Sequence, residues 1–257
     1  MTTDARCIYM SAWKKFLLAS WGALVFAGGS DDTVSPLKEA PSAQDLLYRT
    51  RYAIYLEDTE LEGNLRKGWK KTPVTFSLSK GVVSMKIQPS KASPWELGVD
   101  IKEAQPTLWI KEAGKSRAPS VEEFGDKVAG TDFTIEDLAM RFLYWNDAEF
   151  RGEEELKGQH AKIIRVQNPL EEGPYQWVDL WILPESGTLM QMEAYNSSGQ
   201  KITRYRILNV MKIKGRYQLE RLKIEALKPE TGKVESYSYL QFEKPRQSGI
   251  SRIKGLR

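Results

Sequence analysis

The stretch GTDFTIEDLAMRFLYW, residues 130–145, is the segment around which the rest of the chain is organised. Thr134 suits an N-cap, because its hydroxyl can accept a hydrogen bond from a first-turn amide, and Asp137 stands at the capping-box spacing. The pattern therefore predicts one short helix from Thr134 to Trp145, which needs an apolar surface to lie on. Its apolar stripe consists of Ile135, Leu138, Ala139 and Phe142, widened by Trp145.

The surface is predicted by the residues on both sides of this stretch, where hydrophobic and polar residues alternate. Runs of period two extend from Thr59 to Ile110 and again from Ile164 to about residue 243. Such alternation is typical of antiparallel strands with one buried and one wet face, and successive strands without intervening helices exclude a βαβ design. A sheet of about ten or eleven strands curls, so we predict a mainly β fold, an unclosed antiparallel barrel.

Two stretches interrupt this pattern. Residues 113–130 are rich in Gly, Lys, Pro and Ser and are interpreted as an insertion that carries the helix across the sheet. Residues 153–155, three glutamates, are interpreted as a turn-like, solvated surface. Before the first strands, Ser42 and Asp45 form another capping box, which predicts a helix to about Leu56. The buried side of that helix would hold Leu46, Leu47, Ala53 and Ile54.

The N-terminal residues 1–27 have the pattern of a secretory signal peptide. Lys14 and Lys15 precede an uncharged apolar run that ends in small residues, and Met1 or Met10 could be the start. The alternative is an anchor that is never cut. A Gly-, Ser-, Asp- and Pro-rich linker would follow at 28–41, then a single domain at 42–245 and a basic tail at 246–257. The single cysteine, Cys7, precedes the apolar run, so we expect an exported, soluble, unlipidated protein in the periplasm.

Composition offers little catalytic chemistry. The formal net charge of +4 over 257 residues is too small to indicate a nucleic-acid partner. A Ser-His-Asp triad could be built only around His160, the one histidine, which is interpreted as a surface residue at the start of a strand. No spacing of metal ligands and no phosphate-binding glycine loop is present. We therefore expect no enzyme activity, no cofactor and no metal.

An apolar interior remains, and it could be fully packed or could hold a ligand. Position by position, each residue of the interior is more often ordinary core than ligand contact, although methionines suit an adaptable apolar lining. Alternation alone predicts the cavity wall: Phe76, Leu78, Met85, Ile87, Leu97, Val99, Leu180, Ile182, Met190 and Met192.

The order of these features resembles the LolA-like outer-membrane lipoprotein-sorting proteins, in particular the branch that includes a spirochaetal lipid-binding lipoprotein. The resemblance covers roughly residues 42–243 and is most specific at Gly130 to Thr134, with support from Trp181-Ile182 and from residues 192–195. It implies a LolA/LolB-like barrel covered by a helical lid, residues 134–145, above a cavity for acyl chains. We place no equivalent of the lid-locking arginine of the well-studied carriers, because Arg141 falls on the wrong side of the predicted helix.

Three functions are compatible with this sequence. The first is a monomeric periplasmic carrier of lipoprotein acyl chains or other lipids, sorting them toward the outer membrane between an inner-membrane donor and an outer-membrane acceptor. The second is a cell-envelope interaction or sensor module that binds a protein through its open edge strands. The third, a hydrolase, lacks the residues that it would need.

Overall fold

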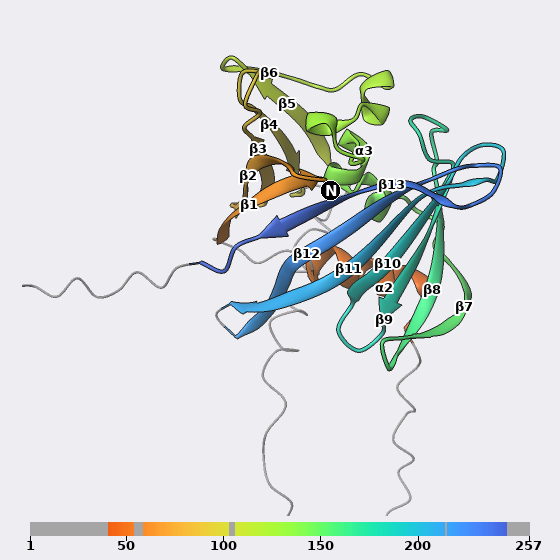
Figure 1. The fold of residues 1–257 in the computed structure, drawn as a ribbon. Helices are drawn as coiled ribbons and strands as arrows, with labels where there is room; N and C mark the ends of the chain where they lie inside the picture. Colours follow the sequence, from red (N-terminus) through yellow and green to blue (C-terminus); the bar gives the residue numbers. More distant parts are fainter. Residues whose placement is uncertain (1–40, 54–58, 103–105, 214, 246–257) are drawn as a thin grey trace, which may run out of the picture. The chain divides into compact units, whose positions relative to one another are not determined.

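The structure is a computed structural model that describes residues 41–53, 59–102, 106–213 and 215–245. Within these residues one antiparallel sheet of thirteen strands accounts for most of the chain, in the order β6-β5-β4-β3-β2-β1-β13-β12-β11-β10-β9-β8-β7 (Figure 1). The two edges, β6 and β7, do not pair with each other, so the barrel stays open. The predicted mainly β, unclosed antiparallel fold is thus confirmed.

The strand bounds follow the predicted alternation closely. The strands are β1 (Thr59–Lys67), β2 (Lys70–Ser79), β3 (Val82–Ile87), β4 (Trp95–Asp100), β5 (Thr107–Glu112), β6 (Lys115–Arg117), β7 (Glu149–Leu156), β8 (Gln159–Gln167), β9 (Trp177–Leu183), β10 (Thr188–Tyr195), β11 (Lys201–Ile213), β12 (Arg216–Leu227) and β13 (Val234–Phe242). The helical segments are α2 (Ala43–Ala53), η1 (Glu122–Gly125), η2 (Val128–Gly130), α3 (Ile135–Ala139) and η3 (Arg141–Tyr144).

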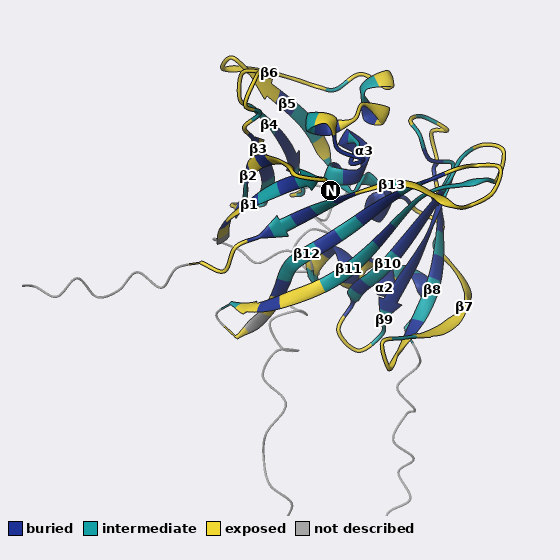
Figure 2. Ribbon diagram, in the orientation of Figure 1, coloured by how far each residue is buried: buried dark blue, intermediate teal, exposed yellow. Residues whose placement is uncertain are grey.

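The two strands that sequence analysis missed are the edge strands. Every residue of β6 is exposed, and β7 is exposed along nearly its whole length (Figure 2). A strand with no buried face has no alternation to detect. The interpretation of residues 153–155 as turn-like was wrong, because these glutamates lie within β7, although they are exposed as predicted. Glu154 accepts a hydrogen bond from Trp181 Nε1 at 2.7 Å.

The sheet is joined at its centre by its first and last strands, since β1 pairs with β13. At this seam Gly63 lies opposite Phe242, and an added Cβ on Gly63 would come within 2.4 Å of the carbonyl oxygen of Gln241. The close approach of the two backbones requires glycine here. The seam matters for the site, because strands from both halves of the sheet line the same interior.

The inner face of the sheet carries the core. Across five strands, Leu61, Phe76, Met85, Leu97 and Ile110 stand opposite one another in register. All but the half-buried Phe76 are buried, and Phe76 packs against the same core. The predicted division into a wet and a buried face therefore holds, and it gives the helical segments an apolar surface to cover.

Helix α2 begins at the predicted capping box. Ser42 Oγ accepts a hydrogen bond from the amide of Asp45 at 3.1 Å, and the amide of Ser42 donates to Asp45 Oδ2 at 3.1 Å. Leu46 and Leu47 have no exposed surface, and Ala53 is half-buried. The predicted end near Leu56 and the residue Ile54 lie outside the described residues.

The expectations for the signal peptide at 1–27, for the linker up to residue 40 and for the basic tail at 246–257 likewise lie outside the described residues. Among the helices that are described, none is both long and apolar enough to cross a membrane.

Candidate functional site

The segment after η2 begins as predicted and then breaks. Thr134 caps α3: its Oγ1 accepts from the amide of Asp137 at 3.2 Å, and its own amide donates to Asp137 Oδ2 at 2.7 Å. The prediction of a single helix to Trp145 was wrong, because α3 ends at Ala139. Met140 adopts the left-handed conformation (φ 49°, ψ 39°), which an α-helix cannot continue through, and the 3-10 helix η3 follows.

The break changes which side chains are buried. Phe142, Leu143 and Tyr144 are consecutive and all buried, so the segment is covered on more sides than the single predicted stripe. The rings of Phe142 and Tyr205 lie 6.4 Å apart in an edge arrangement that packs η3 on β11. We call residues 134–145 the cover segment.

Asp132 fixes the start of the cover segment to the seam of the sheet. Its carboxylate accepts hydrogen bonds from Lys67 Nζ at 2.7 Å, Ser236 Oγ at 2.6 Å and Ser238 Oγ at 2.7 Å. Burial works to raise the pKa of Asp132, but these three hydrogen bonds outweigh burial and hold it below its ordinary value. The conspicuous Gly-Thr-Asp-Phe stretch therefore acts as an anchor, a role that sequence analysis did not assign.

Arg51 of α2 fixes the other end of the cover segment. It is buried, its Nε donates a hydrogen bond to the carbonyl oxygen of Leu143, and its guanidinium lies 4.6 Å from the ring centre of Tyr48 and 5.0 Å from that of Tyr144. No lid-locking arginine was predicted from the sequence. The structure places Arg51 where an arginine holds the cover segment by its backbone.

Arg141 has a different role, within the segment itself. Its Nε lies 2.7 Å from Glu136 Oε2, and its guanidinium lies 3.5 Å from the ring centre of Phe124. Burial raises the pKa of Glu136 from 4.5 to about 7, although the charge and hydrogen bond of Arg141 act against burial. Burial likewise raises the pKa of Asp137, whose carboxylate accepts a hydrogen bond from the hydroxyl of Tyr175.

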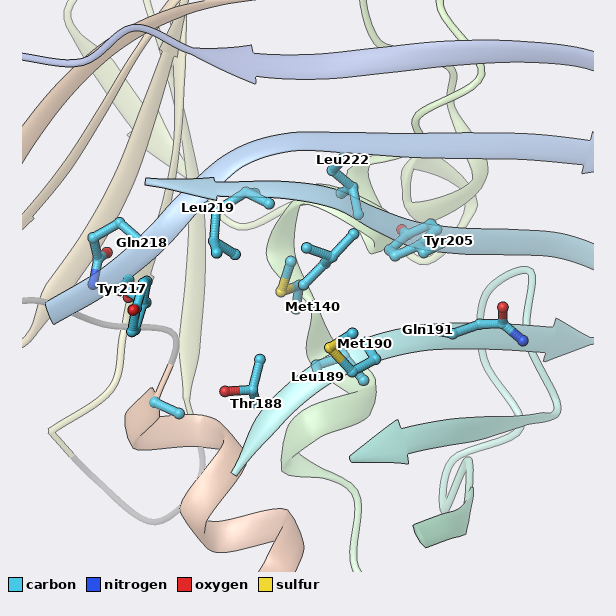
Figure 3. Close-up of a pocket in the computed structure, with 13 residues that line it drawn as sticks. Met140, Thr188, Leu189, Met190, Gln191, Tyr205, Tyr217, Gln218, Leu219 and Leu222 are labelled. Carbon is cyan, nitrogen blue, oxygen red and sulfur yellow. Dashed lines mark hydrogen bonds between the residues drawn. The ribbon is translucent and has the colours of Figure 1, made fainter. Parts of the chain in front are cut away.

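Two apolar cavities adjoin at the break in the cover segment, because Met140 lines both. The first has a volume of about 90 Å³ and the second of about 60 Å³. Four residues line both cavities: Met140, Gln218, Leu219 and Leu222. Figure 3 shows Met140 in the first cavity, between Leu222 on one side and Met190 on the other. The side chain of Met140 thus belongs to the partition between two neighbouring apolar spaces.

The predicted site residues divide into two groups. The first group lines a cavity. Met190 lines the first cavity, and five residues line the second: Phe76, Met85, Val99, Leu138 and Ala139. The second group is buried in the core and lines neither cavity: Ile135, Phe142, Trp145, Leu78, Ile87, Leu97, Leu180, Ile182 and Met192.

Several residues that line the cavities were not among the predicted ones. They come mainly from the seam and from the last strands: Leu61, Val83, Tyr205, Ile207, Leu219, Leu222, Leu240 and Phe242. The signal was present as alternation in those strands, but only their order in the sheet shows that they face the same interior as β2, β3 and β4.

Polar side chains in this interior are few. Buried Gln218 lines both cavities, and its Nε2 donates to the carbonyl oxygen of Tyr217 at 3.0 Å. His160 is exposed at the start of β8, as predicted. Within the described part of the chain, no three His, Cys, Asp or Glu side chains are grouped in a way that could hold a metal ion.

Three solved structures share this architecture. A DUF1329 family protein from Desulfovibrio piger has a TM-score of 0.56 and 16% identity, covering 83% of this chain and 96% of that one. A domain described as an outer membrane lipoprotein-sorting protein, from Vibrio parahaemolyticus, has a TM-score of 0.60 and 12% identity, covering 81% and 94%. A LolA superfamily protein from Nitrosomonas europaea has a TM-score of 0.59 and 16% identity, covering 79% and 92%. At these identities the likeness shows the fold.

A protein-family model, described as that of an uncharacterized protein, matches residues 102–250, which is more than half of the chain. The chain belongs to the family that this model describes. The cover segment and the strands β12 and β13 all lie within the matched residues. Among curated proteins, none matches the sequence significantly.

Proposed function

We propose that this LolA-like protein is a non-enzymatic carrier in the periplasm that binds lipoprotein acyl chains or other lipids for sorting toward the outer membrane. The observation that carries the proposal is the pair of apolar cavities that adjoin at Met140 beneath the cover segment. An acyl chain needs only a long apolar space, because burying each methylene contributes about 0.8 kcal/mol and ten methylenes about 8 kcal/mol. The solved structure of similar fold that is described as an outer membrane lipoprotein-sorting protein domain supports the same proposal.

The cavities represent a closed state of the carrier. At about 90 and 60 Å³ each is smaller than the cavity of about 150 Å³ that holds a single benzene ring. A chain can therefore enter only if the cover segment moves. Met140 is suited to be the place of movement, since its left-handed backbone already divides the segment into α3 and η3, and its unbranched side chain can change rotamer easily.

Methionine substitutions test this proposal, because three methionines line the cavities differently. Met140 lines both cavities, Met190 only the first and Met85 only the second. Alanine at each position removes the same atoms. We expect Met140→Ala to join the two spaces and to raise affinity for a long-chain fluorescent fatty acid, whereas Met85→Ala and Met190→Ala enlarge one space each and leave that affinity close to wild type. Equal binding by all three variants would contradict the proposed partition.

A second experiment addresses the carrier itself. Mass spectrometry of organic extracts from the exported, purified protein should reveal a co-purifying phospholipid or acyl chain. A protein that yields no lipid and does not bind a fluorescent fatty acid is no carrier, whatever the methionine variants do.

The alternative is an interaction or sensor module of the cell envelope. The open edges favour it, because β7 presents an exposed strand to which a partner strand could be added. The glutamates of β7 would then select a basic partner. An empty protein that nevertheless binds a basic peptide, and loses it when Glu153 and Glu155 become lysine, would replace the carrier by this function.

A further inference from the structure

The turn between β1 and β2 presents an unusual side chain to solvent. Trp69 is 95% exposed, more than any other large hydrophobic residue that the structure describes. Lys67 pairs with Lys70 across the turn, and Gly68 takes the left-handed conformation (φ 58°) that so short a connection requires. The hairpin therefore projects the indole away from the sheet.

Cationic residues flank this indole in the sequence. Lys70 and Lys71 follow it directly and are exposed, and among the described residues neither forms an ion pair. Lys67 and Lys127 both approach Asp132 Oδ1, at 2.7 and 3.9 Å. The one buried carboxylate of Asp132 thus faces two ammonium groups, which leaves the tip with a net positive charge.

Arg66 adds to this charge from the outer face of the sheet. Its guanidinium lies 5.1 Å from the ring centre of Tyr239. We call Arg66, Lys67, Trp69, Lys70, Lys71 and Lys127 the basic tip. The tip contacts the residues that precede the cover segment, because Lys70 Nζ donates to the carbonyl oxygen of Ala129 at 3.2 Å and Lys67 binds Asp132.

The chemistry of the tip matches one kind of surface. Indole rings prefer the boundary between hydrocarbon and water, and lysine and arginine are attracted to anionic headgroups. A protein partner would need apolar neighbours around the indole to form a buried hot spot, whereas the neighbours of Trp69 in the sequence are lysines and glycine. A bilayer needs no such pocket, because it accepts the indole itself.

We propose that the basic tip docks on a bilayer that contains anionic phospholipid, with Trp69 inserted at the level of the headgroups and Lys70 and Lys71 paired with their phosphates. This inference goes beyond the carrier function and does not depend on it. Docking would bring the residues that lead into the cover segment close to the membrane surface, since Lys67 and Lys70 already contact Asp132 and Ala129.

Vesicle sedimentation tests the proposal with the exported full-length protein. The vesicles contain phosphatidylcholine alone or mixed with phosphatidylglycerol, and no fatty-acid probe. We expect binding to the anionic vesicles only, weakened by salt. The double variant Lys70→Gln/Lys71→Gln should bind roughly twenty-five-fold more weakly, at about five-fold for each lysine, and Trp69→Ala should also bind more weakly.

The hairpin between β11 and β12 supplies the matched control. Tyr217 is 69% exposed there, with Lys212 Nζ 5.8 Å from its ring centre. Tyr217→Ala and Lys212→Gln should leave vesicle binding unchanged. All variants carry the same N-terminal segment, so differences between them come from the hairpins, and a urea titration confirms that each is folded.

Equal binding of the tip variants and the wild type would overturn the proposal, as would binding that does not require phosphatidylglycerol or that is lost in the control variants. If the protein binds these vesicles but no fatty acid, the docking proposal is supported and the carrier proposal is contradicted. The two proposals therefore fail separately.

Discussion

Arg51 and Leu143 are 92 positions apart in the sequence, yet the side chain of the first donates a hydrogen bond to the backbone of the second. The bond joins α2 to η3 and is independent of which side chain stands at position 143. Asp132 makes the corresponding connection at the other end of the cover segment, to β1 and β13. The segment is thus attached near both ends, and the break at Met140 lies between the two attachments.

Removing the Arg51 attachment should loosen the C-terminal part of the cover segment. Arg51→Met loses a charge-assisted hydrogen bond and two ring contacts, which together stabilise by about 2 to 3 kcal/mol. The amide of Leu143, which donates to the carbonyl oxygen of Met140 at 3.0 Å, should then exchange its hydrogen faster. Hydrogen-exchange mass spectrometry measures this. Arg49→Met is the control, because exposed Arg49 contacts the carbonyl of Pro184 instead; equal acceleration in both variants would contradict the attachment.

Glu136 should give stability a dependence on pH. Its pKa is raised from 4.5 to about 7 by burial, so the folded protein holds this proton more tightly than the unfolded chain does. The contribution of Glu136 to the free energy of unfolding is complete below pH 4.5 and is lost as the pH rises through 7. Glu136→Gln carries no titrating proton, so the stability of the variant relative to wild type should rise across this window and then level off.

Urea titrations across the same window measure this difference. Asp137 also has a raised pKa, but it remains in both proteins, so the comparison isolates Glu136. A difference in stability that does not change with pH would show that Glu136 titrates near its ordinary pKa.

The seam between β1 and β13 should be intolerant of a side chain at Gly63. An added Cβ would meet the backbone of Gln241 at 2.4 Å and the ring of Phe242 at 2.7 Å, and backbone cannot move aside as a flexible side chain can. We expect Gly63→Ala to lower the free energy of unfolding by about 1 to 3 kcal/mol, as overpacking does. Gly125→Ala, where nothing lies within 4 Å, should change it by less than about 0.5 kcal/mol. Similar urea midpoints for the two variants would contradict the close approach.

Two residues of the predicted stripe should behave differently when truncated. Phe142 has no exposed surface and lines neither cavity, so Phe142→Ala should cost about 3 to 5 kcal/mol. Leu138 is half-buried and lines the second cavity, so Leu138→Ala should cost less and should enlarge the space open to a small apolar probe. Thermal unfolding and probe binding distinguish the two variants. A larger loss of stability in Leu138→Ala than in Phe142→Ala would contradict these placements of the two side chains.

Much of the fold could be predicted because alternation and capping are local signals. Phe76, Met85 and Leu97 alternate with polar neighbours in the sequence, and this alternation alone predicts which face of the strand is buried. Thr134 and Asp137 form their capping box within four residues. The edge strands β6 and β7 gave no such signal, since none of their faces is buried.

The candidate site was less predictable, because its members come together only in three dimensions. Alternation could not show that Leu222 and Leu240 share an interior with Phe76, since this depends on the pairing of β1 with β13. Helical periodicity could not show the break at Met140, because the buried positions of Phe142 and Leu143 are set by Tyr205 and Arg51 from distant elements.

By itself, the sequence determined a mainly β, one-sided sheet with a capped helical segment over it, because side-chain polarity at fixed spacing is enough to decide which face meets water. Only the tertiary structure decided that the interior is nearly filled, that two small cavities adjoin at Met140, and that Asp132 and Arg51 hold the cover segment. Packing volume and contacts between residues far apart in the chain produce no periodic pattern in the sequence. They are decided only in the folded protein, where β1 pairs with β13.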